Sequence, residues 1–195
     1  MASFEIAYGI TRQHEGGWHG ATGTNSADRG GETYKGIARK FWSSWAGWTF
    51  VDDFKTQKGF PQNAYDDFDL NRMVRTFYKR EFWDRNRLDD VRSQEIANEM
   101  FDTGVNTGLR QGALWLQRSI NLLNRNERSW KDIKVDGIIG NITLGRVNAL
   151  SISDTTALFN LLNIFQGAHY LSLAEKDKTQ QEFMRGWLQR VELMR

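Results

Sequence analysis

The stretch that decides the fold of this chain begins with His14-Glu15-Gly16-Gly17-Trp18. A loop of small residues follows over 20–27, and then comes Asp28-Arg29-Gly30-Gly31-Glu32-Thr33-Tyr34-Lys35-Gly36-Ile37. Paired glycines commonly end helices, and a second glycine-rich segment commonly turns the chain back. The stretch therefore predicts a helix that ends at Glu15, followed by a short loop or β-hairpin that returns Asp28 and Thr33.

The segment before it, residues 3–14, contains no proline and places Phe4, Ala7 and Thr11 on one helical face together with Glu15. We expect Gly16 and Gly17 to adopt the left-handed conformations that end helices. Partial burial and the negative end of the helix dipole would both raise the pKa of Glu15, as a general acid requires. The alternative is a solvated helix-terminal glutamate.

A helix-borne glutamate followed by Asp28 and Thr33 on a returning loop is the arrangement in which a glycosidase holds a sugar between an acid and a second carboxylate. Glu32 competes with Asp28 for the second role, because the neighbouring glycines leave its direction open. Trp18, on a glycine-flanked loop beside Glu15, is the aromatic residue that we expect to contact substrate, with core packing as the alternative.

The order Glu-Gly-Gly, Asp-x-Gly-Gly-x-Thr, x-Gly-Ile resembles glycoside hydrolase family 108, the N-acetylmuramidases found among phage endolysins and related bacterial proteins. It is also similar to the order in phage T4-type lysozymes. The chain departs from the family pattern at Arg29, Tyr34 and Ala38, where the family has proline, asparagine and threonine. These departures affect expected substrate contacts more than the acid.

Four later segments also resemble the family, and they cover residues 78–83, 101–108, 135–144 and 183–191. The third of these, with Asp136-Gly137 and Gly140 followed by Thr143, also resembles peptidoglycan-binding modules. The resemblance implies Glu15, Asp28 and Thr33 as catalytic residues and Trp18, Tyr34, Asp102 and Asn106 as substrate-binding residues. For Asn106 we weigh substrate binding against capping of the next helix.

The resemblance implies a compact, mainly α, lysozyme-like fold, with a catalytic region over residues 1–92 and a peptidoglycan-binding-like helical region over 93–195, packed as one body. The scarcity of proline agrees with a mostly helical chain. Apolar spacing and glycine positions predict helices over 3–14, 36–47, 69–83, 93–104, 111–123, 155–176 and 180–194, with an irregular passage over 52–67. Gly186 is expected at a close helix contact.

The composition of the chain limits which catalytic groups, metal sites and binding partners it can have. The chain of 195 residues has no cysteine and three scattered histidines, which excludes a thiol nucleophile and argues against a zinc site. A net charge of +2 is too small to predict nucleic-acid binding. No stretch predicts a membrane span or a conventional signal peptide, so we expect a protein that is made in the cytoplasm and acts on the cell wall after holin-type release or dedicated export. We also expect a monomer.

The leading hypothesis is an N-acetylmuramidase that cleaves the β-1,4 bond between N-acetylmuramic acid and N-acetylglucosamine in peptidoglycan glycan strands, without a metal or organic cofactor. A lytic transglycosylase also uses one helix-borne glutamate, but it needs no protein-positioned water. A non-catalytic wall-binding or phage structural protein is the third possibility.

Overall fold

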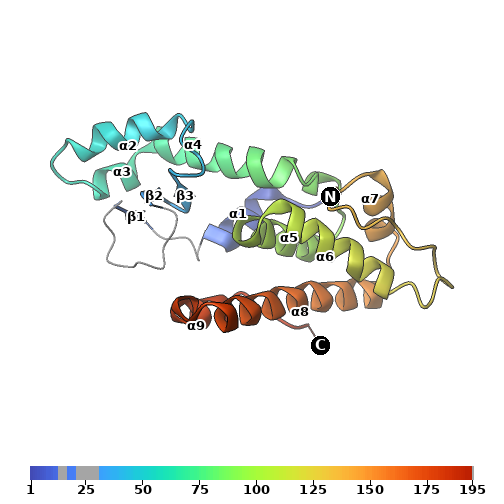
Figure 1. Cartoon of the computed structure of the whole chain (residues 1–195). Coiled ribbons are helices and arrows are strands. Elements are labelled where there is room, and N and C mark those ends of the chain that lie inside the picture. Colours follow the sequence, from blue (N-terminus) through green and yellow to red (C-terminus); the bar gives the residue numbers. More distant parts are fainter. Residues whose placement is uncertain (13–16, 21–30, 195) are drawn as a thin grey trace. The chain divides into compact units, whose positions relative to one another are not determined.

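The structure is a computed structural model, and it describes residues 1–12, 17–20 and 31–194. Helices make up most of the described chain, beside one small three-stranded sheet, which confirms the predicted mainly α fold (Figure 1). The chain forms two compact units. The hairpin unit is Arg12–Arg80, and the helical unit combines Met1–Thr11 with Glu81–Arg195.

The hairpin unit holds the sheet and three helices that contact one another. Asp67 is the N-cap of one of these helices, and its side chain accepts a hydrogen bond from the backbone N–H of Leu70 at 2.7 Å. This helix buries Leu70, Val74 and Phe77 along one stripe. The elements are β1 (Trp18–His19), β2 (Thr33–Tyr34), β3 (Ile37–Ala38), α2 (Gly47–Lys55), α3 (Gln62–Asp66) and α4 (Phe68–Tyr78).

The predicted helix over 36–47 and the irregular passage over 52–67 are both wrong. Strand β3 and successive turns occupy most of the first segment, whereas α2 and α3 form in the second. The helical spacing of the tryptophans reflects tertiary packing instead. Trp42 and Trp45 both pack edge-on against Phe77 of α4, with ring centroids 4.8 and 6.1 Å away.

The predicted helix over 69–83 is confirmed as α4 and its continuation. From Lys79 to Asp84 the helix becomes a π-helix, labelled η2. The division between the two units falls inside this turn, between Arg80 and Glu81. Widened turns of this kind are rare and change the direction of the side chains that follow.

In the helical unit, α5 contacts α1, α6 and α8 (Figure 1). Three aromatic residues, Phe4, Trp83 and Phe101, form the centre of the core with ring centroids 5.7 to 6.0 Å apart. All three are buried, so the first helix of the chain is stabilised by residues far along the sequence. The elements are α1 (Phe4–Thr11), α5 (Gln94–Thr107), α6 (Leu109–Leu122) and α8 (Ile152–Lys176).

Helix α5 does not close at Gly104 as predicted but continues to Thr107. Gly104 is instead a contact point, because a Cβ there would lie 3.1 Å from the side chain of Leu109. The chain turns at Gly108, whose φ is 92°. Gly108 begins α6 without a side-chain cap, so the predicted capping role of Asn106 is also wrong.

Gln117 of α6 fixes the loop before α7 (Asn141–Asn148). Its Nε2 donates to the Asp136 carboxylate at 2.9 Å, and its Oε1 accepts from the backbone N–H groups of Asp136 and Gly137. The buried Gln117 amide therefore accepts hydrogen bonds from backbone N–H groups of a turn that belongs to no helix or strand.

The predicted helix over 180–194 is broken. A short 3₁₀ segment, η4 (Lys178–Phe183), leads into α9 (Met184–Leu188), which ends well before the predicted boundary. Trp187 stacks on Tyr170 of α8 with centroids 5.0 Å apart. The space beside Gly186 is open, so its predicted role at a close helix contact is wrong.

Candidate functional site

The sheet β1-β2-β3 carries three of the predicted site residues, Trp18, Thr33 and Tyr34. Trp18 pairs with Tyr34 and His19 with Thr33, and Thr33 pairs in turn with Ala38. Lys35 and Gly36 connect β2 to β3 with φ values of 45° and 79°. Two positive φ values favour a two-residue hairpin turn, which is why the predicted hairpin forms here.

Trp18 is held from three directions. Its backbone N–H donates to the Tyr65 hydroxyl at 2.6 Å, and its indole N–H donates to Glu32 Oε1 at 3.2 Å. The Phe60 ring packs edge-on with centroids 4.9 Å apart. The indole remains partly exposed. A partly exposed aromatic face in a fixed orientation is suited to stacking on a sugar ring.

Gly17 lies close to Tyr65. A Cβ at this position would lie 2.2 Å from the hydroxyl oxygen of Tyr65. The missing side chain therefore allows Tyr65 to reach the backbone of Trp18.

Glu32 belongs to a charged cluster of two acids and two bases, made of Glu32, Arg39, Asp52 and Lys55. Arg39 Nη1 lies 2.6 Å from Glu32 Oε2, and Lys55 Nζ lies 2.7 Å from Glu32 Oε1. Arg39 also forms a bidentate pair with Asp52, and its guanidinium group lies over the Trp48 ring. The four charges fix the outer end of the hairpin to α2.

The protonation of this cluster follows from its hydrogen bonds. Partial burial by itself would raise the pKa of Glu32, but hydrogen bonds from Lys55, Arg39 and Trp18 outweigh burial and hold the pKa below its ordinary value. The Arg39 hydrogen bond likewise holds the pKa of Asp52 well below its usual range. Glu32 is thus an anion whose oxygens are already engaged, and this suits positioning of Trp18 better than proton transfer.

Thr33 and Tyr34, neighbours on β2, differ in accessibility. Thr33 is partly exposed, and its hydroxyl donates to the Gly31 carbonyl at 3.2 Å, so its oxygen can still accept a hydrogen bond from a water. Tyr34 is fully buried, and its hydroxyl donates to the Ala64 carbonyl at 2.8 Å. Tyr34 therefore serves the core in this structure and offers no surface for the predicted substrate contact.

Asp102 and Asn106 belong to the helical unit, where they form a structural network. Arg190 Nη1 lies 2.6 Å from Asp102 Oδ1, in a pair that is mostly buried. Asn106 Nδ2 donates to the Asp102 carbonyl at 2.8 Å and to its carboxylate at 3.0 Å. These contacts join the end of α5 to the C-terminal segment, so both side chains are already engaged.

The predicted acid, Glu15, and the predicted second carboxylate, Asp28, lie outside the described residues. Of the residues that the sequence singles out, Trp18 and Glu32 are joined by a hydrogen bond, and Thr33 follows Glu32 at the start of β2. Sequence reasoning missed Arg39, Lys55 and Tyr65. A signal for Arg39 existed, because the residue across a hairpin from a glutamate is a natural place for a cation.

Within residues 1–12, 17–20 and 31–194, no group of three acidic or histidine side chains is arranged to hold a metal ion. None of the described helices combines the length and the apolar character needed to cross a membrane.

Comparisons with known proteins cover almost the whole chain. The family model described as glycosyl hydrolase 108 matches residues 8–108. A model described as a predicted peptidoglycan domain matches residues 111–192. No curated protein matches the sequence. The solved structure of Brucella abortus SagA is similar in fold, with a TM-score of 0.60 and 20% identity over 96% of this chain and 88% of that one. The chain belongs to the glycosyl hydrolase 108 family and is a glycoside hydrolase with peptidoglycan as its substrate.

Proposed function

We propose that this family member is an N-acetylmuramidase that hydrolyses the β-1,4 bond between N-acetylmuramic acid and N-acetylglucosamine. The observation that supports the proposal is the hairpin, in which Glu32 accepts a hydrogen bond from the Trp18 indole and Thr33 pairs with His19 of β1. Only Gly16 and Gly17 separate Glu15 from Trp18 in the sequence. Glu15 is therefore tied to the fixed start of β1 by a two-residue connection.

In the proposed reaction Glu15 protonates the glycosidic oxygen as the C–O bond breaks. Asp28 activates or orients a water, or stabilises the oxocarbenium-like transition state, and Thr33 helps to hold that water. The water oxygen bonds to C1 of the muramic acid, one of its protons passes to a carboxylate, either Asp28 or the deprotonated Glu15, and its other proton stays in the new C1 hydroxyl group. Where Asp28 takes the proton, exchange with solvent restores Glu15 to its acid form and Asp28 to its carboxylate. The products are a reducing N-acetylmuramic acid end and a free 4-hydroxyl group on N-acetylglucosamine.

The charged cluster has a supporting role in this proposal. Glu32 stays ionised and accepts the hydrogen bond from the Trp18 indole. Arg39 and Lys55 neutralise it, so the cluster adds little net charge beside the sugar. Trp18 is then held as a rigid platform, which avoids the entropic cost of ordering it when substrate binds.

The test is mass spectrometry of the fragments released from purified peptidoglycan, after borohydride reduction of their ends. Three proteins are compared: the wild type, Glu15→Gln, and the matched control Glu175→Gln, which changes an exposed residue of α8. We expect reduced N-acetylmuramic acid ends from the wild type and the control, and about 10² to 10⁴ times less product from Glu15→Gln, because general acid catalysis contributes a factor of that size.

Other outcomes assign other functions. Anhydro ends that resist borohydride would make the protein a lytic transglycosylase. Binding to sacculi without release of any fragment would make it a wall-binding or structural protein. Substantial turnover by Glu15→Gln would remove Glu15 from the mechanism.

A further inference from the structure

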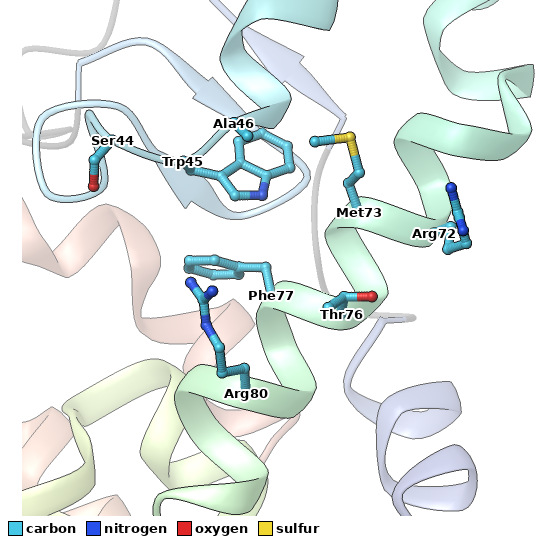
Figure 2. Close-up of a pocket in the computed structure, with 8 residues that line it drawn as sticks. All are labelled: Ser44, Trp45, Ala46, Arg72, Met73, Thr76, Phe77 and Arg80. Atoms are coloured by element: carbon cyan, nitrogen blue, oxygen red, sulfur yellow. The ribbon is translucent and has the colours of Figure 1, made fainter.

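A second feature of the hairpin unit is a pocket of about 310 Å³ between the segment 44–46 and α4 (Figure 2). This volume is at the lower end of the range of about 300–1,000 Å³ that is typical of small-molecule sites. The pocket shares no lining residue with the charged cluster around Glu32. The residues used in the argument are Ser44, Trp45, Arg72, Thr76, Phe77 and Arg80.

One wall of the pocket is apolar. Trp45 and Phe77 are mostly buried and pack edge-on against each other. Met73 reaches toward the segment that holds Trp45, on the same face of α4 as Phe77 (Figure 2). The exposed edges of these side chains can contact a small apolar group.

The rest of the lining is polar and basic. Ser44 and Thr76 provide exposed hydroxyl groups, and Arg72 and Arg80 provide guanidinium groups. Arg80 points back toward the Phe77 ring, inside the group of lining side chains (Figure 2). None of the lining residues is acidic. The pocket therefore favours an anionic group.

Arg72 retains the capacity to bind such a group. Its Nη2 donates to Asp69 Oδ1 at 2.9 Å, and its side chain is 65% exposed. A guanidinium group carries five N–H donors, so one bond to Asp69 leaves others available. Arginine matches the planar geometry of a carboxylate and can bind it through two parallel hydrogen bonds.

We propose that this pocket is a subsite for a carboxylate on the muramyl side of peptidoglycan, carried either by the lactyl group or by the stem peptide. The inference rests on the proposed muramidase function. N-Acetylglucosamine has no charged group, so the carboxylates of the glycan strand lie on the muramyl substituents. The adjoining methyl groups of lactate and alanine fit the apolar wall, while the arginines bind the carboxylate.

The test measures kcat and KM on soluble glycan strands in three forms: with stem peptides, with peptides removed to expose the lactyl carboxylate, and with all carboxylates amidated. The variants are the double substitution Arg72→Gln with Arg80→Gln, the pocket-filling Thr76→Trp, and the control Arg75→Gln on the same helix but outside the pocket. Because charge-assisted bonds are lost, we expect the double substitution to raise KM about tenfold on carboxylate-bearing strands, with kcat within about twofold.

Amidated strands should show the raised KM with the wild type, and the double substitution should raise it no further. The strand form on which the arginines matter most identifies the source of the carboxylate. Thr76→Trp should raise KM in the same way, which keeps the test valid if the double variant folds poorly. The proposal would be overturned if the KM of the double variant equals that of Arg75→Gln on every strand form. It would also be overturned if the double substitution raises KM on amidated strands as much as on carboxylate-bearing strands.

A binding measurement separates this inference from the proposed function. Titration calorimetry needs no turnover and uses two ligands: N-acetylmuramic acid, which carries the lactyl carboxylate, and N-acetylmuramoyl dipeptide, whose carboxylate is on the peptide. We expect the double variant to bind at least one of them about tenfold more weakly than Arg75→Gln does. If the wild type releases no fragments, the muramidase proposal fails, whereas equal affinity of the two variants for both ligands defeats the pocket proposal alone.

Discussion

At the scale of single residues, Trp18 owes its orientation to neighbours that lie far along the sequence. Tyr65 accepts from its backbone, Glu32 accepts from its indole, and Phe60 packs on its ring. These contacts restrict the side chain before substrate arrives, so they lower the entropic cost of binding.

A substitution series at Trp18 tests this role. Trp18→Ala removes the aromatic face and should lower kcat/KM about tenfold or more, which corresponds to roughly 1.4 kcal/mol. Trp18→Phe keeps an aromatic face but loses the bond to Glu32, so it should fall between the wild type and alanine. Initial rates on soluble glycan strands measure both.

The matched control is Trp130→Ala, because Trp130 is also partly exposed and donates a hydrogen bond from its indole, at 3.3 Å to the Ile120 carbonyl. It should leave kcat/KM within about twofold once the folded fraction is taken into account. Equal losses at Trp18 and Trp130 would mean that Trp18 acts through stability alone.

At the scale of one element, α5 buries an acid within the helical unit. Burial raises the pKa of Glu99 to about 8, and the nearby Asp102 carboxylate acts in the same direction. The Thr103 hydroxyl donates to Glu99 Oε1 at 3.1 Å and opposes the shift, as does a hydrogen bond from Asn163. The folded protein therefore holds a proton on Glu99 that the unfolded chain releases at lower pH.

This burial predicts the direction of a pH effect on stability. The contribution of Glu99 is fully present below its unfolded pKa of 4.5 and is lost as the pH rises through its folded value of about 8. The free energy of unfolding should fall by roughly 2–4 kcal/mol across that interval. Glu99→Gln should remove most of this fall and stabilise the protein at pH 8.

Urea unfolding between pH 5 and pH 8 measures the effect, with Glu175→Gln as the control for loss of an exposed glutamate. The control should keep the pH dependence of the wild type. If Glu99→Gln shows the same decline as the wild type, the decline comes from other groups.

At the scale of the whole molecule, the family boundaries and the compact units divide the chain differently. The two family models meet near residue 110, at the start of α6. The helical unit, in contrast, combines α1 with α5, α6 and α8. The predicted catalytic region over 1–92 stays a prediction. The contacts show only that α5 shares its core with helices of the second matched segment.

These contacts predict that the first matched segment is not self-sufficient. A chain truncated after residue 108 would expose the faces of α5 that α6 and α8 cover. Exposing a large apolar side chain costs about 1.5–3 kcal/mol, against a total stability of about 5–15 kcal/mol. Amide hydrogen exchange should show loss of protection in α5, relative to the full chain. Full protection of α5 in the truncated chain would contradict this interpretation.

The sequence by itself determined the helical class, the hairpin after the first helix and the long amphipathic helices, because these depend on local spacing, turn residues and glycine positions. Helix α4 and its continuation lie where the apolar stripe predicts them. The order of short motifs along the chain is also enough to indicate the family. Prediction from local spacing failed where aromatic residues pack against residues distant in the sequence, as Trp42 and Trp45 do against Phe77.

Only the tertiary structure decided which polar residues meet. Arg39 and Lys55 are separated in sequence from Glu32, yet both neutralise it. Tyr34 and Asp102, which the family resemblance predicts at the substrate, contact the Ala64 carbonyl and Arg190. Spacing along the chain specifies which face of an element a side chain occupies. The partners that cover that face depend on packing between elements, because a contact needs two surfaces and local sequence describes only one of them.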